Sequence, residues 1–355
     1  MKKRSNVGDS RRDLRRRGVF RVQRSSVCAA LVSAVALASA MLAPSSSVDA
    51  AESPLALETK IPLGDVAGRI DHLAFDAARQ RLYVAELGNG SVGIVNLKAG
   101  RVERTIDGFD EPQGIGYDAA TDAVYVASGG DGSVRAFSAG EFAPLATLSL
   151  DDDADNVRID RDGARVYVGY GSGALAIIDA ANRKEIARVP LEGHPESFQL
   201  YPDGDSIFVN VPDASEIAVV SRKAGKQTAS WRTGSLRANF PLAIDASTSR
   251  VIAVFRRPAR LRAFDARTGT VVHEADVCGD SDDLFVDSRR RRLYVVCGQG
   301  YVDVLDADDY RRVGRFTTSP GSRTGLYVPE IDRLLVAIRA TDDEPAAVWV
   351  LQPQP

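Results

Sequence analysis

The side chains that could do chemistry stand in seven polar clusters along the chain, spaced by about forty residues. Oxygen ligands from scattered positions suit Ca²⁺ or another divalent cation, and imidazoles extend the choice to transition metals. The same groups could instead bind an organic or peptide ligand, or bond only to neighbouring loops and ordered water. The clusters consist of Arg69, Asp71 and His72; Gln113; Asp153, Asp155 and Asn156; His194, Glu196 and Ser197; Asn239; Asp280, Asp282 and Asp283; and Arg323 and Thr324.

Three arginines form a separate basic group. Arg256, Arg257 and Arg260 flank Pro258 in a loop that we predict on the same face as the polar clusters. Three guanidinium groups could clamp a carboxylate or phosphate bidentately, so this loop is a candidate anionic-ligand site. The alternative is a solvated charge run whose members pair with nearby aspartates.

The cysteines indicate one disulfide. Cys28 lies in the N-terminal fifty residues, which leaves Cys278 and Cys297 in the rest of the chain. Two cysteines in an oxidising compartment usually form one bridge. Metal ligation is the weaker alternative, because no second cysteine pair or nearby histidine supplies the remaining ligands.

The first fifty residues differ from the rest of the chain. A basic stretch precedes the apolar run 27–43, and Val48 and Ala50 follow as the −3 and −1 residues of a cleavage site. The run is short and rich in alanine, so we predict a removed Sec signal peptide over 1–50 and a periplasmic or secreted mature protein. The pair Arg11–Arg12 leaves a twin-arginine route open. An uncleaved N-terminal anchor is the alternative.

The charge of the mature chain argues against one class of partner. Removing 1–50 takes away 10 of the 45 basic and 3 of the 48 acidic residues, which leaves a net charge of −10. Such a body repels phosphate backbones, so nucleic acid is disfavoured as a partner. No membrane span is expected after signal removal. We therefore expect an envelope protein, a glycan or a small ligand as the partner.

A recurring strand motif shows which elements must position the polar clusters. Its second residues are 42, 42, 41, 44, 42 and 41 positions apart, a period typical of blades or solenoid turns. Three other short runs, separated by Gly, Asp and Asn turns, accompany each copy, which indicates a four-stranded antiparallel blade. The sequence therefore predicts an all-β, seven-bladed β-propeller. The copies are LYVA (82–85), VYVA (124–127), VYVG (166–169), IFVN (207–210), VIAV (251–254), LYVV (293–296) and LLVA (334–337).

The two ends of the repeat array complement each other. The last copy stops after AVWVL (347–351) without a fourth strand, whereas LALETKIPL (55–63) stands unpaired before the first blade. We predict that this N-terminal strand completes blade seven and removes the open sheet edges. Residues 51–355 then form a single propeller domain, which we expect to be monomeric.

In a propeller the innermost strands line a central channel, and the loops leading into them open onto one face. This placement predicts a ligand-binding channel mouth. Its expected side chains are Arg69, Asp71, His72, Gln113, Asn156, His194, Glu196, Asn239, Asp282, Asp283 and Arg323.

Three segments resemble the YVTN-type β-propeller repeat, in which a tyrosine-valine strand is followed by a Gly/Asn turn and a second apolar strand. They are LYVAELGNGSVGIVNLKAG (82–100), VYVASGGDGSVRAFSAG (124–140) and VYVGYGSGALAIIDAAN (166–182). The resemblance covers the mature chain, although blades four, five and seven depart from the tyrosine pattern. It implies the fold but no single activity, since such propellers act as binding surfaces, extracellular scaffolds and, in related families, enzymes.

Two functions follow from these features. The first is a binding or scaffold protein, because the nucleophile elbow, the dinucleotide fingerprint and the zinc-protease helix motif are missing from the sequence. The second is a metal-dependent hydrolase that resembles propeller lactonases in site composition only. Its metal ligands would be Asn156, Glu196, Asn239 and Asp282 or Asp283, with Asp71 or His72 as the base.

Overall fold

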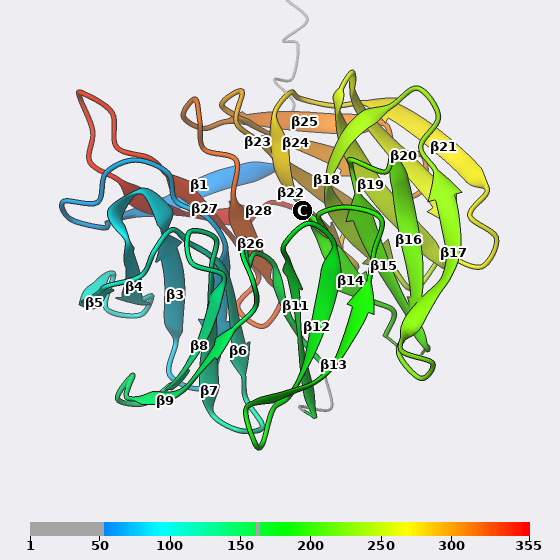
Figure 1. The fold of residues 1–355 in the computed structure, drawn as a ribbon. Helices are drawn as coiled ribbons and strands as arrows, with labels where there is room; N and C mark the ends of the chain where they lie inside the picture. Colours follow the sequence, from blue (N-terminus) through cyan, green and yellow to red (C-terminus); the bar gives the residue numbers. More distant parts are fainter. Residues whose placement is uncertain (1–52, 161–163, 203) are drawn as a thin grey trace, which may run out of the picture. The chain divides into compact units, whose positions relative to one another are not determined.

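The computed structural model describes residues 53–160, 164–202 and 204–355, so the predicted signal peptide and Cys28 lie outside the described residues. The described residues form seven four-stranded antiparallel sheets in a ring (Figure 1). This confirms the predicted all-β, seven-bladed propeller. In the described part of the chain, no helix is long and apolar enough to cross a membrane.

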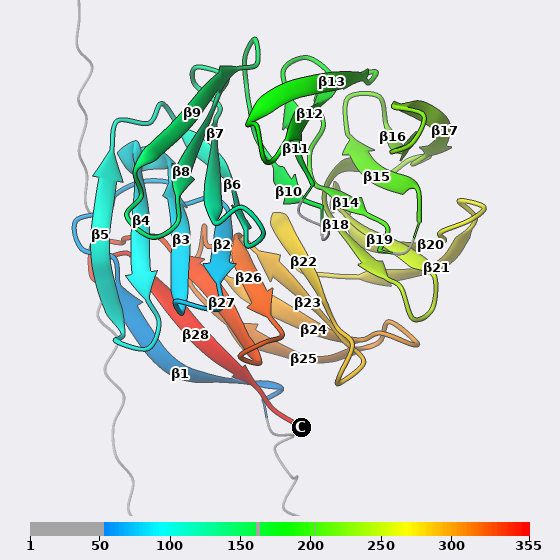
Figure 2. The ribbon, with the colours of Figure 1, turned by 90° about the horizontal axis from the view of Figure 1, so that it is seen from below.

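Each blade runs from an inner strand at the channel to an outer strand at the rim. Figure 2 shows the inner strands β2, β6, β10, β14, β18, β22 and β26 nearest to the centre of the ring. Blades one and two contain β2 (Leu73–Asp76), β3 (Arg81–Glu86), β4 (Ser91–Asn96), β5 (Arg101–Asp107), β6 (Pro112–Asp118), β7 (Ala123–Ser128), β8 (Ser133–Ser138) and β9 (Pro144–Ser149), with the 3₁₀ turn η1 (Leu87–Asn89) after β3.

The remaining five blades repeat this order. Blades three and four contain β10 (Val157–Ile159), β11 (Arg165–Tyr170), β12 (Ala174–Asp179), β13 (Lys184–Pro190), β14 (Phe198–Leu200), β15 (Ser206–Val211), β16 (Glu216–Ser221) and β17 (Lys226–Arg232). Blades five to seven contain β18 (Arg237–Asp245), β19 (Arg250–Arg257), β20 (Ala259–Asp265), β21 (Val271–Asp276), β22 (Ser281–Asp287), β23 (Arg292–Cys297), β24 (Tyr301–Asp306), β25 (Arg312–Thr317), β26 (Gly325–Val328), β27 (Arg333–Ile338), β28 (Ala347–Pro353) and β1 (Leu55–Pro62).

The N-terminal strand closes the ring as predicted. β1 pairs antiparallel with β28, with Leu55 opposite Pro353 and Pro62 opposite Ala347. Blade seven therefore combines three strands from the C-terminal end with one from the N-terminal end (Figure 2). The pairing holds the first and last blades together and leaves no unfilled position in the ring.

A buried aspartate ends several of the inner strands and starts the turn to the next strand. The Asp76 carboxylate accepts hydrogen bonds from the backbone N–H groups of Ala78 and Arg79, at 2.9 and 3.0 Å. Asp287 accepts equivalent hydrogen bonds from the backbone N–H groups of Arg289 and Arg290. Asp is favoured here because its short side chain satisfies the turn's own backbone.

Two of the repeated tyrosines join neighbouring blades. Tyr83 and Tyr125 are fully buried, and their hydroxyl groups donate to the carbonyl oxygens of Ala139 and Ala180 in the following blade, at 3.2 and 3.1 Å. The apolar core is accordingly distributed over seven clusters, each made by side chains of adjacent blades. Such packing holds the inner strands, and the loops before them, at fixed positions around the channel.

The predicted disulfide is present. Cys278 and Cys297 are bonded, with their Cα atoms 5.9 Å apart. Cys278 follows the outer strand β21 and Cys297 ends β23, so the bridge joins blades five and six beside the loop that leads into β22.

Candidate functional site

The channel has two ends, which differ in composition. We call the end at which the inner strands begin the front mouth, and the end at which they finish the back mouth. The front mouth holds a cavity of about 190 Å³ above a deeper pocket of about 20 Å³. The cavity is lined by Arg69, Gln113, Asp153, Asp155, His194, Glu196, Phe240, Arg256, Asp282 and Arg323. Asp71, His72, Asn156 and Ser197 line the deeper pocket.

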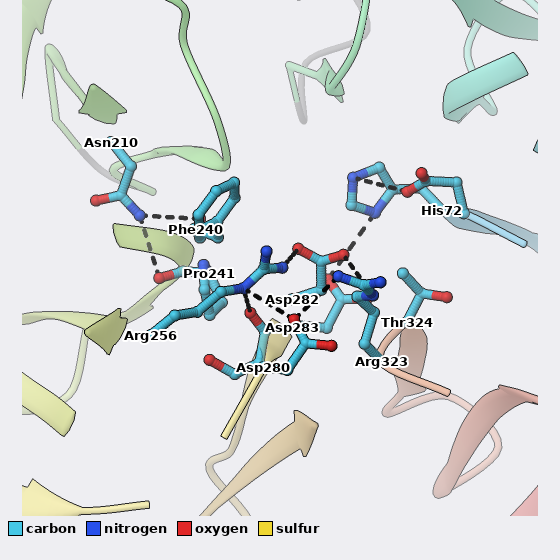
Figure 3. A network of polar contacts seen from close by, with 12 residues as sticks. His72, Asn210, Phe240, Pro241, Arg256, Asp280, Asp282, Asp283, Arg323 and Thr324 are labelled. Carbon is cyan, nitrogen blue, oxygen red and sulfur yellow. Dashed lines mark hydrogen bonds and ion pairs between the residues drawn. The ribbon is translucent and has the colours of Figure 1, made fainter. Parts of the chain in front are cut away.

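Two arginines and two aspartates form one side of the front mouth (Figure 3). Arg256 Nη2 donates to Asp282 Oδ1 at 2.5 Å, and Arg323 Nη1 donates to Asp280 Oδ1 at 3.0 Å. The guanidinium of Arg256 also lies over the Phe240 ring, 3.8 Å from its centroid, in a cation–π contact. Burial raises the pKa of Asp282 to about 7, although Arg256 opposes the rise.

His72 lies between the two ends of the channel and is surrounded by carboxylates. Its Nε2 atom is 3.8 Å from Asp71 Oδ1 and 3.9 Å from Asp155 Oδ1, while Nδ1 is 3.9 Å from Asp283 Oδ1. Burial alone would lower the pKa of His72, but the three carboxylates outweigh burial and raise it. An imidazolium at this position offsets charges that the channel would otherwise leave unpaired. Arg69 Nη2, 2.5 Å from Asp71 Oδ2, completes the pairing on the front side.

The opposite side of the front mouth is also paired. His194 Nδ1 donates to the Gly171 carbonyl oxygen at 2.7 Å and lies 3.5 Å from Asp153 Oδ2. Gln113 Nε2 donates to Asp153 Oδ1 at 3.2 Å. Burial alone would lower the pKa of His194. The hydrogen bonds to Asp155 and to the Gly171 carbonyl outweigh burial, and the pKa is raised to about 9. His194 is therefore a cation at neutral pH.

Glu196 differs from the other carboxyl groups of the front mouth. It lines both the cavity and the deeper pocket, and its carboxyl group makes no hydrogen bond to a described residue. Burial raises the pKa of Glu196 well above its ordinary range, and Asp155 and Asp282 raise it further. The raised pKa favours the protonated form of Glu196, which can both donate and accept a hydrogen bond.

Four predicted site residues have other surroundings. Asp283 faces the back of the channel, where its Oδ2 accepts the Gly325 N–H at 2.8 Å. Asn239 is fully buried between blades and lines neither front pocket, because its Nδ2 donates to Asn210 Oδ1 and to the Glu216 carbonyl oxygen, at 3.0 and 2.9 Å.

The three arginines around Pro258 do not converge. Arg257 is exposed and Arg260 pairs with Asp276 at 3.2 Å, which leaves Arg256 alone at the cavity.

The residues considered as metal ligands do not fit a metal centre. Asn239 lies apart from the front pockets and the Asp282 carboxylate is paired with Arg256, which leaves only Asn156 and Glu196 of the proposed ligands together at the deeper pocket. Among residues 53–160, 164–202 and 204–355, no group of three or more His, Cys, Asp or Glu side chains is placed to hold a metal ion. We derive no metal-dependent step from this site.

Sequence reasoning missed two residues of the channel. Phe240 follows Asn239 directly, so a search confined to polar side chains passed over it. Arg158 lies within β10, where its charge stands between the apolar residues Val157 and Ile159. A charged residue inside a predicted buried strand was the signal that could have found it.

Comparison with known proteins supports the fold alone. No protein-family model matches the chain, and no curated protein matches its sequence. Among solved structures, the fold is similar to a Kuenenia stuttgartiensis hydrazine synthase chain with a TM-score of 0.70. The two are 14% identical, over 84% of this chain and 96% of that chain. At this identity the likeness identifies the chain as a β-propeller protein and carries no activity to it.

Proposed function

We propose that the mature chain is an exported binding protein whose front mouth binds a small, neutral, polyhydroxylated ligand such as the terminal sugar of a glycan. The observation that carries this proposal is the Glu196 carboxyl group, which has no partner in a mouth where the neighbouring carboxylates are paired. A protonated carboxyl group offers one donor and one acceptor on adjacent oxygens, as a pair of sugar hydroxyls requires.

The charges around Glu196 also support a neutral ligand. Arg256 and Arg323 are paired with aspartates, and Gln113 is bonded to Asp153. In these pairs the charges offset each other while donors and acceptors remain at the cavity, which suits hydroxyl groups better than a fully charged ion. A cavity of about 190 Å³ limits the bound part to about one ring.

Export and family membership belong to the same proposal. The Cys278–Cys297 disulfide supports an oxidising compartment. We infer that 1–50 is removed during export, by the Sec or the twin-arginine route, and that 51–355 acts as a monomer in the periplasm or outside the cell. The buried inter-blade tyrosines support membership of the YVTN-type propellers.

The test compares three chains on one panel of monosaccharides. A glycan array with the mature protein selects the sugar, and calorimetry then measures its affinity for the wild type, Glu196→Ala and Glu196→Gln. We expect alanine to weaken binding about tenfold, because a buried hydrogen-bonding partner is lost. Glutamine should retain most of the affinity, since its amide also donates and accepts.

The control is Glu141→Ala, which removes an exposed carboxylate remote from the channel and should leave binding unchanged. Equal losses from alanine and glutamine at position 196 would show that the proton on Glu196 has no part in binding. Failure of the whole panel to bind would remove the sugar as the ligand.

A further inference from the structure

The back mouth contains a second cavity, which is larger than the front one and of different character. Its volume is about 440 Å³, and it reaches inward as far as His72. The inner strands build most of its walls, and Ala77, Pro329 and Glu330 contribute from the turns that follow β2 and β26. Its apolar lining includes Leu73, Phe75, Ile115, Val157, Phe285 and Leu326.

Arg158 supplies a positive charge in this apolar lining. Its Nη1 donates to the Val157 carbonyl oxygen at 2.9 Å and its Nη2 to Ser197 Oγ at 3.3 Å. Among the described residues, no carboxylate lies within ion-pair distance of the guanidinium, unlike Arg69, Arg256 and Arg323 in the front mouth. Burial lowers the pKa of Arg158, although Asp283 and Asp155 oppose this from a greater distance.

The other charged group at the inner end of the cavity is already satisfied. Asp283 accepts the Gly325 N–H at 2.8 Å and lies 3.9 Å from His72 Nδ1. Its charge is thus offset within the protein, whereas that of Arg158 has no direct counter-ion. A partly buried cation without a paired anion is poorly compensated, so an anion that reaches Arg158 is stabilised by more than it would be at the surface.

We propose that the back mouth binds a monocarboxylate with an aromatic or branched apolar body. The carboxylate would pair with Arg158 at the inner end, where the planar guanidinium can donate two parallel hydrogen bonds. The body would lie against Phe75, Phe285 and Leu326, removing their partly exposed surface from water. A cavity of about 440 Å³ is of the size that small-molecule sites have.

The experiment uses 1-naphthoate and its uncharged analogue 1-naphthalenemethanol as probes of the mature, disulfide-bonded chain. Calorimetry should show naphthoate binding at least about tenfold more tightly, because the ring is the same and only the carboxylate meets Arg158. Arg158→Gln should abolish this preference. Arg158 lies over the Phe198 ring, 5.6 Å from its centroid. Arg135→Gln is the matched control, since Arg135 likewise donates to a backbone carbonyl and lies over an aromatic ring, but on the strand β8 outside the channel.

A second variant keeps the test valid if Arg158→Gln does not fold. Leu326→Trp changes a partly exposed wall residue and fills the cavity while leaving the guanidinium in place. We expect it to abolish naphthoate binding and to leave sugar binding at the front mouth unchanged. Equal affinity for the two probes, or naphthoate binding that survives Leu326→Trp, would overturn the proposal.

Discussion

The two ends of the channel differ in how they hold their charged side chains. The front mouth collects charged side chains from strand ends and from the loops before the inner strands and pairs them, as Arg256 with Asp282 and Arg323 with Asp280. The back mouth is built mainly from the strands, combines apolar side chains with polar ones, and holds Arg158 without a direct counter-ion. In both regions the group that points to a ligand has no direct partner: the Glu196 carboxyl group in front and the Arg158 guanidinium behind.

The largest loss of folding stability should come from replacing His72, which lies between the two mouths. Replacing His72 with leucine leaves Asp71, Asp155 and Asp283 buried without their central cation. We expect the free energy of unfolding to fall by about 4 kcal/mol, as in other proteins where one partner of a buried ion pair is removed. Urea denaturation of the mature chain measures the loss.

The pH dependence of this loss gives an internal control. The raised pKa of His72 means that its stabilising charge is fully present below the ordinary histidine pKa of about 6.5 and disappears as the pH rises through the raised value. The difference between wild type and His72→Leu should therefore shrink at high pH. A difference that is constant from about pH 6 to pH 10 would mean that packing, and not charge, accounts for the effect.

Removing the disulfide should weaken ligand binding at the front mouth more than at the back mouth. It closes a loop with a sequence separation of 19 and stands beside Asp280, which precedes β22, and Asp282, near the start of that strand. Replacing Cys278 and Cys297 together with alanine should lower the free energy of unfolding by about 3 kcal/mol. Sugar affinity should fall further than naphthoate affinity, because the back cavity is held by the strands. Equal losses at both mouths would contradict this division between loops and strands.

The sequence predicted the ring because periodicity and turn chemistry are local properties. The tyrosine period, the aspartate turns and the unpaired strand at 55–63 were sufficient for seven blades and their closure. The candidate site was predicted only as a set of residues, since pairing depends on which side chains face each other across the channel. Asn239 shows the limit: it stands at the expected position in its repeat, yet the structure uses it between blades.

The smallest expected effect is the change of ligand affinity with pH. It also compares the two mouths most directly. If the sugar binds only protonated Glu196, its affinity is constant below the raised pKa of this group and falls about tenfold per pH unit above it. Glu196→Gln should remove the slope, because the amide does not titrate. Naphthoate at the back mouth should change less over the same range, since Arg158 stays charged and only His72 and Asp283 titrate beside it. Calorimetry with both ligands from about pH 5.5 to pH 8 tests this, and parallel slopes would show that one shared titration controls both mouths.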